Sequence, residues 1–262
     1  MAKHSDVVLI HGAWAGSWVW DGLLDGLRAA GFRPHAVDLP GNGQDNTPPG
    51  EVHLQRYVDH VARLIERLDG PVHLVGHSGG GITATAVAER LAERIASVSY
   101  IAGMMLPSGA GFADLCRELV QDFPEAAGIG PWLQATESGS EVPPEVACAF
   151  FFHDAPVAAA LRAARRLVPQ PDGGRALHAH WSAARFGQLP RLYVECSADR
   201  SVVPIVQQEM QHRVPGAQRL VLDCGHAPQL AAPDQLLYGL IEFFSRHPRP
   251  VYCMATVANP QE

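Results

Sequence analysis

A glycine–X–serine–X–glycine motif centred on Ser78 constrains the fold of this chain more than any other feature. The apolar run Val72–Gly76 leads into the motif, and Gly81–Arg94, a stretch of small residues with a helical pattern, follows at once. A strand that turns this sharply into a helix holds the serine hydroxyl at the tip of the turn. We expect Gly76 and Gly79 to be required there, because a Cβ at either position would clash in so tight a turn. The motif predicts a nucleophilic serine; the alternative is a serine that only caps a helix.

A nucleophilic serine needs a base that takes its proton and an acid that orients that base and balances its charge. Asp199 follows the strand-like run Arg191–Cys196, and His226 follows the next such run, Gln218–Leu222. The order serine, aspartate, histidine, with the acid and the base after separate strands, resembles the triad order of the α/β hydrolases. We therefore predict Asp199 as the acid and His226 as the base.

Two other acids lie near these positions. Glu195 stands inside its predicted strand, where a carboxylate would need a buried partner. Asp223 precedes His226 by only three residues and could reach the ring only if the chain folded back locally. The preceding strand, Val98–Ala102, is followed by no carboxylate. Asp199, at the mouth of its strand, is therefore the preferred acid.

A second loop carries a possible oxyanion site. The strand-like run Val7–Ile10 leads directly into His11-Gly12-Ala13-Trp14, whose backbone can aim an N–H at a developing oxyanion. A second N–H is expected from Gly79, at the positive end of the helix after Ser78. These two loops predict a site that stabilises negative charge on a carbonyl oxygen.

Composition excludes several classes of function. The 262 residues, 47% hydrophobic and 18% charged, fit one soluble α/β domain with an insertion. No apolar run reaches the ~18 residues of a membrane span, and no secretory signal is visible, so we expect a cytoplasmic protein. The net charge of −7 argues against a nucleic-acid partner. Lys3 is the only lysine, a bias that suggests a GC-rich bacterial genome.

The cysteines and histidines give no sign of a metal site or a cofactor. Five widely spaced cysteines form no CxxC pair, so neither a disulfide framework nor a zinc site is expected; they are Cys116, Cys148, Cys196, Cys224 and Cys253. His178 and His180 form the only tight histidine pair and lack carboxylate or cysteine ligands at suitable spacing. We predict neither a metal nor a cofactor.

Strand and helix patterns alternate through most of the chain, which predicts a mostly parallel sheet of six strands with helices on both faces. The expected strands are Val7–Ile10, Arg33–Asp38, Val72–Gly76, Ser97–Ala102, Arg191–Cys196 and Gln218–Leu222. The expected core helices are Trp18–Ala30, His53–Leu68, Gly81–Arg94, Pro204–Arg213 and Ala232–Arg246. We assign residues 1–105 and 190–248 to an α/β-hydrolase core and residues 249–262 to a tail.

The alternation fails between residues 106 and 189, after the strand that ends near Ala102. Helical pieces are expected there at Ala113–Gln121 and Ala155–Val168, with no clear strand. An insertion at this point would lie over the carboxyl ends of the strands, so we predict a helical cap over the active site. Its aromatic residues are Trp132, Phe150, Phe151, Phe152 and Trp181. Most should fill the cap's own core, and we predict Trp132 and Phe150, with Gly12 and Trp14, as substrate-binding residues.

Several runs resemble one branch of the α/β hydrolases, which includes the plant methylesterases of the salicylate-binding protein type, the hydroxynitrile lyases and bacterial ester hydrolases. The resemblance rests on His11–Trp18, the Gly-His-Ser elbow, Tyr193–Arg200 and Gly225-His226, and extends over nearly the whole chain except the cap. It implies the triad roles for Ser78, Asp199 and His226. It also implies that the backbone amides of Ala13 and Gly79 form the oxyanion hole.

Two positions separate esterases from lyases within that branch. The hydroxynitrile lyases carry threonine where this chain has Gly12, and lysine where it has Ala227. Without both residues, a departing cyanide has no electrostatic partner. We therefore predict a serine esterase acting on a small or natural-product methyl ester. The alternatives are a lactonase or a cofactor-free C–C lyase with the same triad, and a ligand-binding receptor that keeps the fold.

Overall fold

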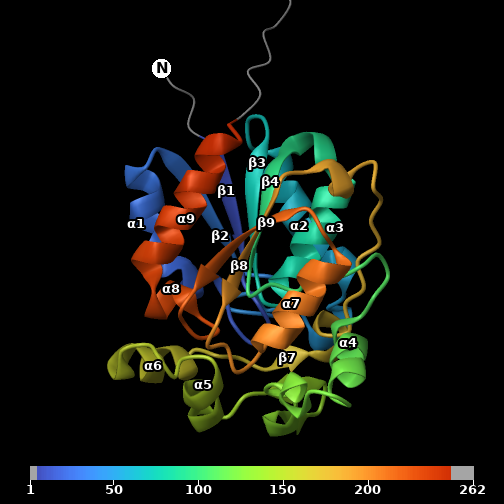
Figure 1. The fold of residues 1–262 in the computed structure, drawn as a ribbon, viewed down its shortest axis with the longest axis vertical. Helices are drawn as coiled ribbons and strands as arrows, with labels where there is room; N and C mark the ends of the chain where they lie inside the picture. The colour runs from blue at the N-terminus through green and yellow to red at the C-terminus, as the bar shows by residue number, and fades with distance from the viewer. Residues whose placement is uncertain (1–4, 249–262) are drawn as a thin grey trace, which may run out of the picture.

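A computed structural model describes residues 5–248, and the predicted tail, residues 249–262, lies outside the described residues. A single sheet of six parallel strands forms the centre of the molecule, in the order β2-β1-β3-β4-β8-β9 (Figure 1). The strands are β1 Ser5–Ile10, β2 Phe32–Val37, β3 Val72–His77, β4 Ile95–Ile101, β8 Arg191–Cys196 and β9 Ala217–Leu222. The prediction of six parallel strands is confirmed.

The sheet separates two hydrophobic layers, because successive side chains of a strand point to opposite faces. In β1, Val8 and Ile10 belong to the hydrophobic layer that includes residues of α2, α3 and α7, whereas Val7 and Leu9 belong to the layer that includes residues of α1 and α9 (Figure 1). The core helices are α1 Asp21–Ala29, α2 Leu54–Glu66, α3 Gly80–Arg90, α7 Pro204–Arg213, α8 Pro228–Ala231 and α9 Pro233–Arg246. Both faces of the inner strands are therefore buried, which explains their unbroken apolar runs. No helix within residues 5–248 is long and apolar enough to cross a bilayer.

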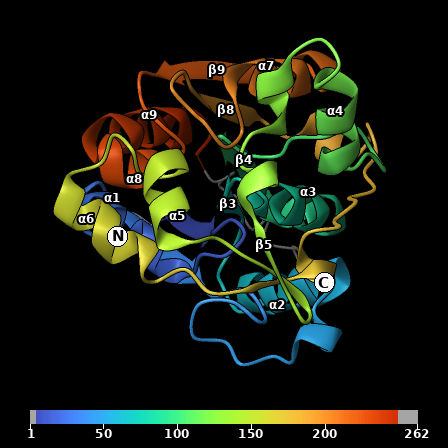
Figure 2. The same ribbon diagram turned by 90° about the horizontal axis from the view of Figure 1, so that it is seen from below.

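Most of residues 106–189 lies at the carboxyl ends of the strands, and the last part runs back beside the end of α3 to the start of β8 (Figure 1). Figure 2 shows α5 and α6 in front of the sheet when the molecule is seen from below. The helices there are α4 Phe112–Leu119, α5 Pro144–Phe150 and α6 Val157–Ala164. The expectation of no strand in this segment is wrong. Three short strands, β5 Gln134–Thr136, β6 Gly139–Glu141 and β7 Gln170–Pro171, form a small antiparallel sheet. Strands of two or three residues are too short to show a period-two pattern in the sequence.

Single 3-10 turns connect many of these elements. One of them, η1 Ser17–Trp20, replaces the first turn of the helix that the sequence predicts from Trp18. The others are η2 Pro49–Glu51, η3 Ala92–Arg94, η4 Pro124–Ala127, η5 Gly130–Trp132, η6 Asp172–Gly174 and η7 Phe186–Gln188. The remaining boundaries of the core elements agree with the sequence within a few residues, as is usual for fraying ends.

Candidate active site

The turn between β3 and α3 places Ser78 at the tip of a strained elbow. Ser78 has a φ of +51°, a conformation that non-glycine residues rarely adopt. A Cβ on Gly76 would lie 2.8 Å from the carbonyl oxygen of Gly80, and a Cβ on Gly80 would lie 2.4 Å from that of His11. At Gly79 the nearest atom would be 3.8 Å away. Gly76 is therefore required as predicted, whereas the second required glycine is Gly80 rather than Gly79.

Backbone hydrogen bonds hold this elbow on both sides. The Ser78 N–H donates to the carbonyl of Ile101 at the end of β4 (3.1 Å). The Ser78 carbonyl accepts from the N–H groups of Gly81 (3.0 Å) and Met104 (2.9 Å). The strained residue is thus fixed to the neighbouring strand and to the first turn of α3.

Asp199 and His226 meet at the carboxyl ends of β8 and β9. His226 Nδ1 lies 2.7 Å from Asp199 Oδ2, and each residue is only 3% exposed. The other carboxylate oxygen of Asp199 accepts the N–H groups of Ser201 (2.7 Å) and Val202 (3.0 Å). The Asp199 carboxylate can only accept a hydrogen bond, so the neutral form of the His226 ring carries its proton on Nδ1. Nε2 is then the basic nitrogen.

The two alternative acids are engaged elsewhere. Buried Glu195 is paired with the exposed side chain of Arg219 through two contacts of 2.8 Å, which supply the partner that its carboxylate needs. Asp223 accepts a hydrogen bond from Ser197 Oγ at 3.0 Å. Among the described residues, Asp199 is the only acid hydrogen-bonded to the His226 ring.

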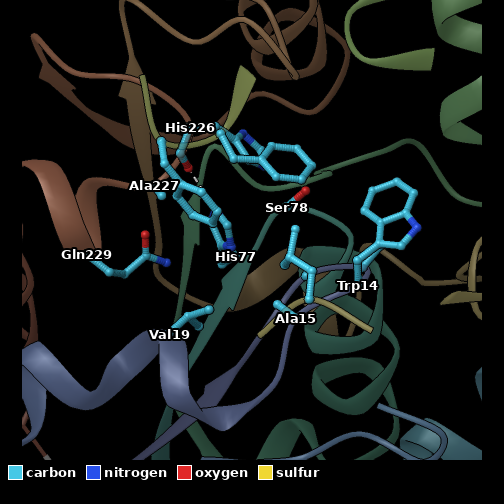
Figure 3. Close-up of a pocket in the computed structure, with 13 residues that line it drawn as sticks. Trp14, Ala15, Val19, His77, Ser78, His226, Ala227 and Gln229 are labelled. Atoms are coloured by element: carbon cyan, nitrogen blue, oxygen red, sulfur yellow. Dashed lines mark hydrogen bonds between the residues drawn. The ribbon is translucent and has the colours of Figure 1, made fainter. Parts of the chain in front are cut away.

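Ser78 and His226 line one small pocket with a cavity volume of about 30 Å³ (Figure 3). Most of its wall is apolar, with Trp14, Phe151 and Leu167 among the lining residues. The hydrogen bonds found among residues 5–248 do not include one between Ser78 and His226. The structure therefore shows the Asp199–His226 pair, with Ser78 and His226 lining one pocket.

The four residues predicted to bind substrate divide into two pairs. Gly12 and Trp14 line the pocket, as expected. Trp132 and Phe150 do not line it: their rings contact each other at 5.8 Å, and Trp132 is 55% exposed. The pocket is lined instead by the residues that follow Phe150, Phe151 and Phe152. Successive residues near a helix end point about 100° apart, and the sequence does not reveal which of them faces the pocket.

The backbone N–H groups of Ala13 and Gly79 lie close together beside Ser78. The ideal position of a Cβ on Gly79 is 3.8 Å from the nitrogen of Ala13. Neither N–H donates a hydrogen bond within the described part of the chain, whereas the next one, that of Trp14, donates to Gln170 Oε1 at 3.0 Å. Gly79 is also the N-cap of α3, where the helix dipole is positive. Two free, adjacent donors suit an oxygen that carries negative charge.

Residues that the sequence analysis missed hold the first loop in place. His11 Nε2 accepts the N–H of Leu39 at 3.0 Å, so its Nδ1 carries the proton and donates to the carbonyl of Gly12 at 2.7 Å. Burial lowers the pKa of His11, which keeps the ring neutral. Trp14, at a φ of +61°, is fixed from the cap by the bond to Gln170. Nothing in the sequence around Gln170 signals this role.

Two further residues support the loop of the predicted base. His77 Nε2 donates to the backbone carbonyl of His226 at 2.8 Å. Burial, with a contribution from the nearby His226, lowers the pKa of His77 to about 3, so this ring is neutral near pH 7. From the cap, Asp154 accepts the N–H of Gly225, the residue before His226. The base is thus fixed at its ring, its own carbonyl and the preceding amide.

A family model described as the alpha/beta hydrolase family matches residues 7–237, most of the chain. The chain belongs to the alpha/beta hydrolase family. This agrees with the elbow, the order of the strands and the pairing of Asp199 with His226.

Named relatives lie in the branch that the sequence resembles. A pyrethroid hydrolase of Sphingobium wenxiniae is 29% identical, over 98% of this chain and 93% of that protein. Methylesterase 10 of Arabidopsis thaliana is 28% identical, over 92% of each chain. These relatives are hydrolases and esterases, in agreement with the class of enzyme and the branch predicted from the sequence.

Solved structures show the same fold. A crystal structure of a pyrethroid hydrolase has a TM-score of 0.80 and 24% identity, covering 92% of this chain and 97% of that one. A methylesterase from Arabidopsis also has a TM-score of 0.80 and 24% identity, covering 92% and 99%. The likeness at these identities concerns the fold.

Proposed function

We propose that this protein hydrolyses carboxylic esters through an acyl-enzyme on Ser78. The observation that carries the proposal is the Asp199–His226 pair, whose Oδ2 and Nδ1 atoms are 2.7 Å apart. His226 lines the same pocket as Ser78, the serine held in a strained elbow. Catalytic hydrogen bonds often shorten only when the substrate is bound, so the missing bond between Ser78 and His226 is compatible with this role. The named relatives, a pyrethroid hydrolase and several methylesterases, support the same class of reaction.

The first half of the reaction follows from the roles of the three side chains. His226 Nε2 takes the proton of the Ser78 hydroxyl as its oxygen attacks the ester carbonyl. Asp199 stabilises the imidazolium that forms. The imidazolium then gives its proton to the leaving alkoxide, and the acyl group stays on Ser78. In the second half, His226 deprotonates a water that attacks the acyl carbonyl, and the acid and free serine are released.

The N–H groups of Ala13 and Gly79 are the proposed donors to the oxyanion. They are free of other partners in the described structure and lie beside Ser78. Donors that already point at the site of developing charge need no reorganisation during the reaction, and each contributes about 10²–10³ in rate. His11 and Gln170 act as positioning residues because they hold the loop that carries Ala13.

The substrate that we propose is a small ester, with a methyl ester as the first choice. The wall of the pocket is mostly apolar, and the segment of residues 106–189 that supplies Phe151 and Phe152 acts as its cap. A cyanohydrin lyase is disfavoured, because a Cβ on Gly12 would lie 2.7 Å from the Cβ of Ser78 and Ala227 carries no charge. Lactone opening uses the same acyl-transfer steps and remains the alternative substrate class.

Replacement of the nucleophile tests the proposal. We expect Ser78→Ala to lower kcat for p-nitrophenyl acetate by about 10⁶, which is the loss when a triad nucleophile is removed. Ser138→Ala, at an exposed serine of the cap, serves as the matched control and should hydrolyse the ester like the parent. Parent-like turnover by Ser78→Ala, with both variants folded by circular dichroism, would refute the assignment.

A further inference from the structure

Three buried polar atoms without hydrogen-bond partners belong to two residues that line the proposed active-site pocket. They are the amide oxygen and amide nitrogen of Gln229 and the Nδ1 atom of His77. Gln229 is 3% exposed and His77 is 6% exposed, so bulk water does not solvate these atoms freely. A buried polar group that makes no hydrogen bond costs about 1–3 kcal/mol. Such groups therefore indicate a partner that binds at this place.

The hydrogen-bond roles of these atoms follow from the structure. His77 Nε2 faces the carbonyl oxygen of His226 at 2.8 Å, and a carbonyl can only accept, so Nε2 carries the proton. Since burial lowers the pKa of this ring to about 3, it is neutral near pH 7 and its Nδ1 is a bare acceptor. Trp20 packs edge-on against the ring, with centroids 6.3 Å apart, and restricts its rotation. The Gln229 amide supplies both a donor and an acceptor.

Both residues come from elements of the central sheet and its helices, since His77 ends β3 and Gln229 lies in α8. Gln229 projects from α8, three residues after His226, and its side chain extends toward His77 (Figure 3). Ala15 and Val19, from the loop after β1 and from η1, are apolar residues that line the same pocket. The polar atoms are therefore isolated in an apolar wall, where a hydrogen bond to a ligand gains strength and specificity.

We propose that Gln229 and His77 form a polar subsite for a hydroxyl group of the substrate, so that the enzyme prefers hydroxylated esters. A hydroxyl can donate to His77 Nδ1 and accept from the Gln229 amide nitrogen at the same time, whereas a carboxylate cannot donate to Nδ1 and an alkyl group can do neither. The inference rests on the proposed function, since it concerns the substrate of that same site. The competing explanation is an ordered water, which buried polar cavities commonly hold.

Matched ester pairs test the subsite. In each pair, one ester carries a hydroxyl group and the other carries a methyl group at the same atom. That atom lies two to five carbons from the ester. In one series it is on the acyl side of the ester, and in the other series it is on the alcohol side. We expect the parent to prefer the hydroxylated member of at least one pair by about tenfold or more in kcat/KM, because its alkyl partner leaves buried groups unpaired. Equal rates throughout both series would overturn the proposal and favour a resident water.

A variant of similar size assigns the preference to the proposed atoms. Gln229→Met keeps the approximate length of the side chain and removes the amide, so the hydroxyl-to-methyl ratio should fall close to one. Gln121→Met, at an exposed glutamine after α4, is the matched control and should keep the parent ratio. A parent-like ratio in folded Gln229→Met would overturn the proposal; if this variant does not fold, Gln229→Leu takes its place.

A bound structure gives a readout that does not depend on turnover. In a crystal structure of Ser78→Ala with the preferred hydroxy ester, the hydroxyl oxygen should lie within hydrogen-bond distance of the Gln229 amide and His77 Nδ1. An ester bound with water retained between these groups would overturn the subsite and leave the proposed function intact. Parent-like turnover by Ser78→Ala would instead refute the proposed function, while the hydroxyl-to-methyl ratio would still report on the subsite.

Discussion

At the scale of single residues, Asp199 and Glu195 show how position relative to a strand determines the partner of a buried carboxylate. Glu195 lies within β8 and forms an ion pair with Arg219, whereas Asp199 lies three residues beyond the strand and contacts the His226 ring. Both carboxylates are almost fully buried. The two carboxylates therefore differ in their partners. Replacing each by its amide should have different effects on activity.

We expect Asp199→Asn to lower kcat for ester hydrolysis by about 10⁴, because an amide at this position favours the wrong tautomer of His226. Glu195→Gln is the matched control. It should lower stability, because the buried partner of Arg219 loses its charge, and should keep most of kcat. Steady-state kinetics with chemical unfolding of both variants checks this prediction. A larger loss of kcat in Glu195→Gln than in Asp199→Asn would contradict the assignment of the acid.

The predictable part of the site consists of residues that follow strands. Because the carboxyl ends of parallel strands meet at one edge of a sheet, the positions of Ser78, Asp199 and His226 after three strands were enough to predict a common site. Gln170 was not predictable, because it reaches Trp14 from a part of the cap that the sequence does not relate to the first loop. The sequence does not show which of Phe150 and Phe151 lines the pocket, because that depends on the rotation of one short helix.

At the scale of elements, the strand–elbow–helix unit depends on close backbone contacts between β3 and α3. The sequence predicts both elements, because their patterns are long enough to show a period. It does not predict the sheet of β5, β6 and β7, whose strands are too short for any period. Nor does it show which glycines the elbow needs, because that depends on distances between backbones.

We therefore expect Gly76→Ala and Gly79→Ala to have opposite effects on the free energy of unfolding. A Cβ at Gly76 would lie 2.8 Å from backbone atoms, and such overpacking costs about 1–3 kcal/mol. At Gly79 the φ of −56° suits alanine and there is space, so stability should be unchanged or rise by about 0.4–1 kcal/mol. Urea unfolding of the two variants measures the difference. If Gly79→Ala proves the less stable of the two, the description of the elbow is wrong.

At the scale of the whole molecule, the pocket forms between two parts of the chain. The first loop and the His226 loop follow strands of the central sheet, and each has a hydrogen-bond partner from residues 106–189, Gln170 and Asp154 respectively. The same arrangement buries His11 and His77 as neutral rings. Global stability should therefore depend on the protonation of these histidines in the unfolded chain.

The folded pKa of His77, about 3, is below the ordinary histidine value of 6.5. As the pH falls below about 6.5, the unfolded chain takes up a proton that the folded protein does not accept until about pH 3, so stability falls across that window. The contribution of His77 is a slope of up to about 1.4 kcal/mol per pH unit. We expect the free energy of unfolding of His77→Gln to depend less steeply on pH between pH 4.5 and 6 than that of the parent. The difference in slope should correspond to about one bound proton and is measured by urea unfolding at each pH.

His212→Gln, at an exposed position on α7, is the control and should keep the parent slope. A slope in His77→Gln equal to that of the parent would mean that His77 takes up its proton in the folded protein as readily as in the unfolded chain.

If ester hydrolysis proceeds through an acyl-enzyme, Ser78 becomes acylated, and peptide mapping of the trapped intermediate detects this. Rapid acid quench of the protein with excess p-nitrophenyl acetate, followed by proteolysis and mass spectrometry, should show one acetyl group on the peptide that contains Ser78. The adduct should be absent from Ser78→Ala. Turnover without any adduct, or an acetyl group on another residue that appears and decays at the rate of turnover, would contradict the account.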